Sequence, residues 1–158
     1  MQPAGRVLLV EPDDVARGIL EVAASKLAEV ESHRIFETAR ARLYCAPFDF
    51  LVTNVRLAAF NGLHLVYLSS PSQGAPRAIV YSDDRDARLA REVQRAGAFY
   101  EVGACLPVTF AAYIMGSLPD HDRRNPALPD RRSQVRGGRR CWDHHLDSVS
   151  QTYDAPSV

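Results

Sequence analysis

Lysine is the scarcest of the charged residues in this chain of 158 residues. The sequence has 19 basic side chains, and Lys26 is the only lysine among them. A mechanism that requires a lysine side chain after residue 26 therefore has none to use. This absence bears on the candidate chemistry considered below.

Net charge, cysteine pairs and long apolar runs are also missing. Nineteen basic residues balance nineteen acidic ones, so no overall field attracts the chain to nucleic acid or membranes. Cys45, Cys105 and Cys141 are far apart and form no CxxC pair, which favours reduced thiols. No apolar run approaches the ~18 residues that span a bilayer, and the N-terminal residues have no signal-peptide pattern. These absences predict a cytoplasmic protein without a membrane partner.

Short apolar runs alternate with amphipathic segments over the first 118 residues. The runs typical of strands cover residues 6–10, 31–36, 48–54, 77–82 and 99–102. Helices are predicted over residues 14–28, 37–44, 63–69, 83–96 and 108–118. Strands that alternate with helices indicate an α/β fold, in which helices cover both faces of a five-stranded parallel sheet.

The first predicted helix has a clear apolar periodicity. Val15, Ile19, Val22 and Leu27 fall on one stripe, which is typical of an amphipathic helix. Asp13 or Asp14, just before the stripe, can cap the helix by accepting backbone N–H bonds.

Polar residues gather where three predicted strands end. Glu11 and Asp13 follow the first strand, Asn54 ends the third and Ser82 ends the fourth. The strand before Asn54 is almost wholly apolar, as in strands that are buried on both faces. Open α/β sheets place their chemistry in the crevice outside the carboxyl ends of their strands. The sequence therefore predicts one crevice that these polar residues share.

The composition changes after Pro119. From residue 122 to 140 there are seven arginines against two aspartates, whereas residues 141–158 have three aspartates and no basic residue. This pattern predicts a flexible, disordered tail over 119–158, basic first and acidic after. The arginines of residues 123–140 could contact nucleic-acid phosphates, although nothing beyond electrostatics indicates this.

Residues 6–118 resemble the receiver domain of two-component response regulators. Five segments follow the order and spacing of that family: Val7–Glu11, Phe48–Asn54, Leu57–Leu63, Ile79–Ser82 and Gly97–Ala98. The resemblance implies a CheY-like, flavodoxin-like fold with strand order 2-1-3-4-5 and one receiver-like domain over residues 1–118. It also implies a role in phosphorelay signal transduction, with a histidine kinase or another regulator as partner. The family's partner face corresponds here to residues 85–118.

The chemistry that the resemblance implies is not matched by the residues. In the family an aspartate accepts the phosphoryl group, and carboxylates with a backbone carbonyl hold Mg²⁺. Here Asn54 stands at the acceptor position, and an amide oxygen is a very poor nucleophile. Pro12 replaces the main metal-ligating carboxylate. The position of the family's lysine falls on Ala104 or Leu106, depending on the alignment.

Few counterparts of the family's site remain. Ser82 keeps the hydroxyl position, Arg56 offers a backbone carbonyl, and Glu11 with Asp13 forms a vestigial acidic pocket. An amide at Asn54 needs no counter-ion, so the loss of metal and lysine together is electrostatically consistent. We expect a pseudo-receiver that is not an enzyme, binds Mg²⁺ weakly or not at all and acts by protein–protein contact without aspartyl phosphorylation.

Three questions stay open in the sequence. The family's aromatic switch position falls on Tyr100 or on Glu101, one residue apart. The Leu106–Pro107 bond could be cis or trans. The alternative function is a nucleic-acid-associated regulator, with the receiver-like body as a dimerisation scaffold and residues 123–140 on phosphates.

Overall fold

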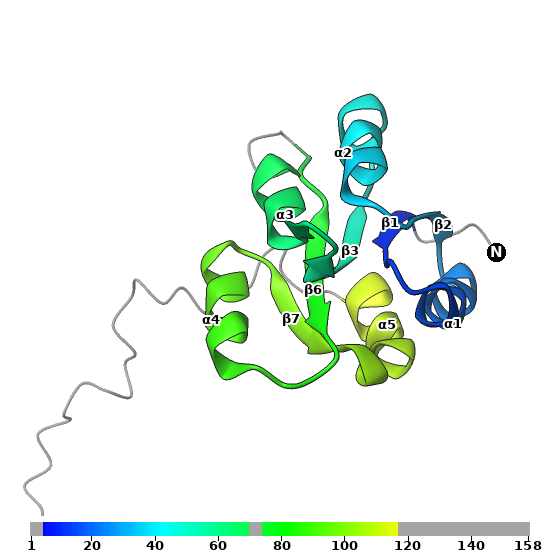
Figure 1. The fold of residues 1–158 in the computed structure, drawn as a ribbon. Helices are drawn as coiled ribbons and strands as arrows, with labels where there is room; N and C mark the ends of the chain where they lie inside the picture. Colours follow the sequence, from blue (N-terminus) through cyan, green and yellow to red (C-terminus); the bar gives the residue numbers. More distant parts are fainter. Residues whose placement is uncertain (1–4, 70–73, 117–158) are drawn as a thin grey trace, which may run out of the picture. The chain divides into compact units, whose positions relative to one another are not determined.

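The computed structural model describes residues 5–69 and 74–116. The predicted domain boundary at residue 118, the predicted tail over 119–158 and its arginines all lie outside these ranges. Within them, five parallel strands form one sheet in the order β2-β1-β3-β6-β7 (Figure 1). This is the predicted order 2-1-3-4-5, because β4 and β5 form a separate two-stranded hairpin. The predicted α/β fold is confirmed.

Helices follow the sheet strands in turn. The strands of the large sheet are β1 (Arg6–Val10), β2 (Glu29–His33), β3 (Phe50–Asn54), β6 (Arg77–Ser82) and β7 (Phe99–Val102). The helices are α1 (Asp14–Ser25), α2 (Phe36–Cys45), α3 (Leu63–Ser69), α4 (Ala87–Arg95) and α5 (Leu106–Met115), with a 3₁₀ turn, η1 (Gly103–Cys105), before α5. The hairpin strands are β4 (Arg56–Leu57) and β5 (Phe60–Asn61).

Helices on both faces bury the sheet. Side chains alternate along β1, so Leu8 and Val10 join the core formed with α2, α3 and α4, whereas Val7 and Leu9 join the core formed with α1 and α5. All five residues of β3 are buried, as its apolar sequence predicts. The central strand thereby places Asn54 at the carboxyl edge.

Several predicted boundaries are shifted: α1 ends at Ser25 instead of residue 28, and α4 begins at Ala87 instead of residue 83. The second strand was predicted over residues 31–36 but covers Glu29–His33, because it pairs with β1 from Glu29 opposite Arg6. Phe36 instead begins α2 and is buried in the core. The predicted loop over 57–62 contains most of the β4–β5 hairpin.

The last helix also differs from the prediction. It begins at Leu106 instead of Val108 and ends at Met115. Pro107 lies in the first turn, where its missing N–H group is not needed. The Leu106–Pro107 bond is trans, since the described residues contain no cis peptide bond.

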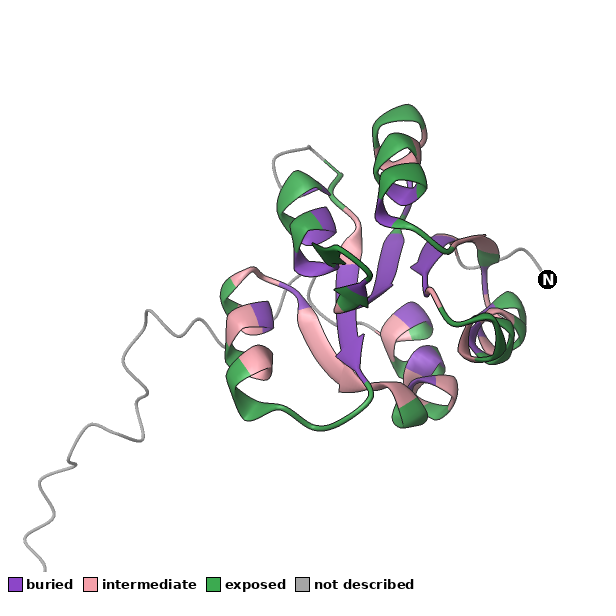
Figure 2. Cartoon of the chain, in the orientation of Figure 1, coloured by how far each residue is buried: buried purple, intermediate pink, exposed green. Residues whose placement is uncertain are grey.

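The outer face of α1 is the largest departure from a simple amphipathic pattern. Val15, Ile19 and Val22, from the predicted apolar stripe, are exposed, while Leu20 and Ala24 face the core (Figure 2). The helix has two apolar stripes, and periodicity alone cannot tell which of them packs on the sheet.

Candidate functional site

The carboxyl ends of β1, β3 and β6 bring the predicted polar residues to one edge of the sheet. Thr53 lies opposite Val10, and Asn54 lies opposite Tyr81, in the parallel register. Glu11, directly after β1, is only 3% exposed. The register therefore places a glutamate, an amide and a phenol side by side beneath the surface.

These three side chains, Glu11, Asn54 and Tyr81, form what we call the inner network. Glu11 Oε2 accepts a hydrogen bond from Asn54 Nδ2 at 2.8 Å and another from the Tyr81 hydroxyl at 2.6 Å. Glu11 Oε1 accepts from the backbone N–H of Asp13 at 2.8 Å. Three donors thus face one buried carboxylate, which is the arrangement that a buried ionised group needs.

The amide of Asn54 is used at both ends. Its Nδ2 donates to Glu11, and its Oδ1 accepts from the backbone N–H of Arg56 at 2.9 Å. The amide satisfies both partners at once, because one needs a donor and the other an acceptor, and an ionised carboxylate has no donor. An aspartate here would turn an oxygen toward a carboxylate.

Tyr81 is the site residue that sequence reasoning missed. It is 2% exposed, and its burial, together with its hydrogen bond to Glu11, raises the pKa of the phenol far above its ordinary value. The hydroxyl therefore remains a donor at any physiological pH. In the sequence Tyr81 is one more strand residue, and only its register opposite Asn54 shows its role.

Gly62 packs directly beneath the inner network. A Cβ atom built on Gly62 would lie 2.1 Å from the carbonyl oxygen of Asn54 and 2.6 Å from Oγ1 of Thr53. The hairpin returns this close to β3 because the N–H of Gly62 donates to the carbonyl of Val55 at 2.9 Å. The Asn-Gly pair of the sequence is thus a steric requirement of the site as well as a turn.

Ser82 belongs to a different arrangement, which we call the outer network: Ser82, Tyr100 and the backbone of Asp84 and Asp86. The two hydroxyl oxygens of Ser82 and Tyr100 lie 2.7 Å apart. Ser82 donates to the carbonyl of Asp84 at 2.7 Å, and the N–H of Asp86 donates to the Tyr100 hydroxyl at 2.9 Å. In the described part of the chain no hydrogen bond joins this network to the inner one.

The outer network identifies the aromatic position that the sequence left open. Tyr100, and not Glu101, reaches the hydroxyl of Ser82. Glu101 lies on the other face of β7, where its Oε2 accepts from the Tyr113 hydroxyl at 3.2 Å. Tyr100 therefore ties the last sheet strand to the β6–α4 loop.

Asp13 does not join the predicted acidic pocket. Its Oδ1 accepts from the backbone N–H of Ala16 at 2.8 Å, so it is the N-cap of α1, and the side chain is exposed. Pro12 beside it has no ligand atom in its side chain. Glu11 is thus the one buried carboxylate of the predicted pair.

The residues present do not fit a resident divalent ion of the kind that the family's chemistry uses. Oxygen ligands must point at such an ion. Here Asn54 Nδ2 and the Tyr81 hydroxyl direct hydrogens at Glu11, so a cation in that space would meet donors. Among residues 5–69 and 74–116, no cluster of three or more His, Cys, Asp or Glu side chains is arranged to hold a metal.

The lysine position of the family is likewise filled by residues without charge. Ala104 is exposed in η1, and Leu106 is fully buried in the core that includes Tyr81 and Phe110. The first turn of α5 therefore contributes packing at this corner and no cation.

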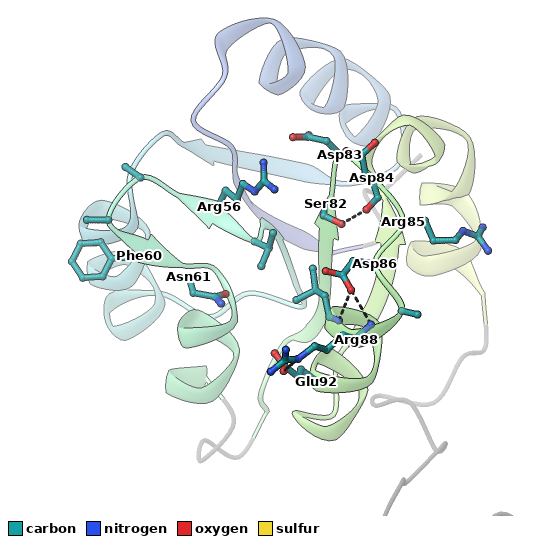
Figure 3. Close-up of a pocket in the computed structure, with 15 residues that line it drawn as sticks. Arg56, Phe60, Asn61, Ser82, Asp83, Asp84, Arg85, Asp86, Arg88 and Glu92 are labelled. Atoms are coloured by element: carbon teal, nitrogen blue, oxygen red, sulfur yellow. Dashed lines mark hydrogen bonds and ion pairs between the residues drawn. The ribbon is translucent and has the colours of Figure 1, made fainter.

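An open hollow lies outside the outer network, between the β4–β5 hairpin and the start of α4 (Figure 3). Its volume is about 990 Å³. Asp86 caps α4 by accepting from the N–H groups of Arg88 and Leu89, which lowers the pKa of its carboxyl. Arg88 also lies 3.5 Å from Glu92, and Arg56 extends along the opposite wall. The wall of the hollow thus carries charges of both signs.

The fold is shared with solved receiver structures. The chemotaxis response regulator CheY4 of Vibrio cholerae has 18% identity and a TM-score of 0.64, with 75% of this chain and 100% of that chain covered. For the BeF3-activated DrrB receiver domain, from Thermotoga maritima, the identity is 16% and the TM-score 0.63, over 73% and 96% of the two chains. A CheY-like receiver domain protein from Methanospirillum hungatei has 19% identity and a TM-score of 0.59, over 73% and 92%.

Comparisons of the sequence itself identify no relative: no known family model matches it, and no curated protein matches significantly. Among the described residues, no helix is long and apolar enough to cross a membrane. The geometry of the sheet and the matches in structure lead to one statement: residues 5–69 and 74–116 have the fold of a response-regulator receiver domain.

Proposed function

We propose that this protein is a pseudo-receiver of two-component signal transduction, which acts by protein–protein contact and not by aspartyl phosphorylation. The inner network carries the proposal. Asn54 occupies the end of β3 where the family's nucleophilic carboxylate would stand, and both ends of its amide are hydrogen-bonded. The amide cannot form a stable acyl phosphate.

The outer network supports a fixed contact surface. Tyr100 and Ser82 bind the backbone of the β6–α4 loop through Asp84 and Asp86 without any phosphoryl group. The loop leads into α4, whose exposed side chains are mainly arginines. The proposed partner face is therefore α4, β7 and α5, within residues 85–118, and α4 suits an acidic partner such as a kinase or regulator domain.

The phosphorylation test uses the whole chain with acetyl phosphate and Mg²⁺, followed by intact mass. We expect no added phosphate on the natural chain. An acid-stable, base-labile adduct in stoichiometric amount would overturn the proposal. Asn54→Asp should remain a poor acceptor, because Pro12 and the absent lysine are unchanged.

The contact test measures how tightly a kinase or regulator domain binds the natural chain, the Tyr100→Phe variant and the Arg91→Glu variant. Arg91 is exposed on α4, so its reversal should weaken binding of an acidic partner by about tenfold without affecting folding. A matched control is Arg40→Glu on α2, which is exposed on a different surface. Equal effects of the two reversals would contradict the proposed face.

A further inference from the structure

The outward face of α1 takes no part in the proposed signalling contact. Val15, Ile19 and Val22 lie along it with 72%, 55% and 63% of their surfaces exposed. Their spacing of four and three residues places them in one row on the helix. A single exposed apolar residue is ordinary, but a row of three forms the kind of patch that marks an interface.

The neighbouring helix extends this apolar surface. Helix α5 packs against α1 on the same face of the sheet (Figure 1) and contains no charged residue. Val108 and Met115 are 84% and 65% exposed, and Ala111 and Ala112 between them are exposed too. Two adjacent helices therefore each turn an apolar row away from the core.

Among the described residues, no packing contact requires a glycine at Gly18, in the middle of the α1 row. Glycine in a helix interior is destabilising relative to alanine. A Cβ built on Gly18 would meet no atom within 4 Å, so the fold itself would accept alanine. What the glycine provides is a notch beside Ile19, through which the backbone of a second helix can approach.

We propose that the protein forms a two-fold homodimer in which two α1 helices pack antiparallel. The row is symmetric about the point between Gly18 and Ile19: Val15 and Val22 stand at equal distances from it. In this arrangement Ile19 of each copy fills the notch at the other copy's Gly18, and each Val15 lies opposite the other copy's Val22. Such self-complementarity is what an isologous two-fold interface requires.

The charges at the ends of α1 favour a second copy over other occupants. Asp13 and Asp14 stand at the start of the helix, and Lys26 stands at its C-cap. Antiparallel packing brings each lysine near Asp13 of the other helix, since Asp14 is already paired with Arg17 and Arg34, whereas parallel packing would put the two lysines together. The rows on α1 and α5 offer on the order of 500 Å² of apolar surface per copy, the core of an interface that typically buries about 800 Å² per partner.

Sedimentation velocity of the full chain, over roughly 1 to 200 μM, tests the association. We expect a reversible dimer, and Ile19→Glu should raise its Kd at least tenfold. The matched control is Tyr44→Glu, an apolar residue 66% exposed on α2, which should leave the Kd unchanged. Circular dichroism checks that both variants fold. A monomer at every concentration, or equal effects of the two variants, would overturn the proposal.

Crosslinking tests the antiparallel geometry, after Cys45, Cys105 and Cys141 are changed to serine. The double variant Val15→Cys with Val22→Cys should form covalent dimers on mild oxidation. In the proposed packing, position 15 of one copy lies opposite position 22 of the other. Within one helix the two positions are about 10 Å apart, too far for an internal disulfide. Either single variant should crosslink at least tenfold less. Efficient crosslinking by the single variants would indicate a different packing and overturn the proposal.

Gly18→Ala separates the dimer from a purely structural role for Gly18. The added methyl group fills the notch, so the dimer should weaken several-fold while the melting temperature at low concentration rises. A tighter dimer with alanine would contradict the proposed approach of the helices.

Discussion

The inner and the outer network are built from similar parts but lie in different surroundings. In each, a tyrosine hydroxyl bonds to a side chain at or just after the carboxyl end of another strand, at the same edge of the sheet. Tyr81 is buried and bonds to a carboxylate, whereas the hydroxyl of Tyr100 binds backbone groups in a partly exposed loop. The same chemical group can therefore have two roles.

The difference in burial indicates which network stabilises the fold and which one shapes the contact surface. Losing a hydrogen bond to a buried charge leaves that charge unsatisfied, whereas water can replace a bond lost at the surface. We infer that the inner network mainly stabilises the fold. The outer network mainly fixes the position of the loop before α4. Variants that act on one network and not the other can test this division.

The largest effect is expected at Gly62. Gly62→Ala would place a methyl group 2.1 Å from the carbonyl oxygen of Asn54, so the hairpin or β3 must move. We expect a loss of about 3 kcal/mol or more in the free energy of unfolding, measured by urea denaturation. Gly74→Ala is the control for an open position, since its Cβ would meet no atom within 4 Å. Gly74 has φ 84°, so only a modest loss from backbone strain is expected there. Equal losses would show that Gly62 is not a close approach.

Asn54→Asp should break the inner network through charge. The new carboxylate would face Glu11 at hydrogen-bond distance, and like charge with burial would raise the pKa of the introduced carboxyl. A raised pKa in the folded state means that stability is lost as pH rises from the unfolded value, about 4, through the folded value. The deficit against the natural chain should be small near pH 4 and reach about 3 kcal/mol at pH 7.

The control for that pH dependence is Asn54→Ala, which removes the amide without adding a charge. Its deficit should not grow between pH 4 and pH 7 as that of the aspartate variant does. Parallel curves for the two variants would show that the carboxylates do not repel each other in the folded protein.

A matched pair of tyrosine variants compares the two networks directly. Tyr81→Phe removes a donor from a buried carboxylate, and we expect a loss of about 2 kcal/mol. Tyr100→Phe removes partly exposed bonds, and we expect about 0.5–1 kcal/mol with faster hydrogen exchange in the β6–α4 loop. Denaturation and hydrogen exchange on both variants check this, and the reverse ranking would contradict the division into two roles.

The smallest effect is expected at Glu31, away from both networks. Hydrogen bonds from Arg42, and then from His33, lower the pKa of this carboxyl to about 2. Its stabilisation should be complete above pH 4.5 and lost as pH falls toward 2. Glu31→Gln should remove under about 1 kcal/mol at pH 7, and its effect should add to that of Tyr81→Phe. The control is Glu29→Gln, at a side chain that is 63% exposed. An effect of Glu31→Gln that does not add to that of Tyr81→Phe would contradict the prediction.

The sequence allowed the sheet and its polar edge to be predicted, because buried parallel strands are nearly continuous apolar runs. It identified Asn54 and Ser82 as strand ends, and the structure places both at that edge. It could not predict that they belong to separate networks. That depends on the face to which each tyrosine points, and a shift of one residue in register exchanges the two faces.

The same limit explains why the exposed stripe of α1 was not recognised and why the choice between Tyr100 and Glu101 stayed open. The helix has apolar residues on two sides, so its rotation on the sheet is set by packing of Leu20 and Ala24 and not by pattern. Tyr100 and Glu101 are adjacent, and only pairing of Val80 with Tyr100 decides which one turns toward Ser82. Tertiary register is the information that local sequence does not contain.

The amide of Asn54 also has a consequence in time. A receiver that carries an acyl phosphate has a built-in clock, because hydrolysis of that bond ends each signal. If the chain is the pseudo-receiver proposed above, hydrolysis does not time its signal, and its output would follow how much of it a cell makes and how fast a cell removes it. Synthesis and proteolysis would then set the duration of the signal.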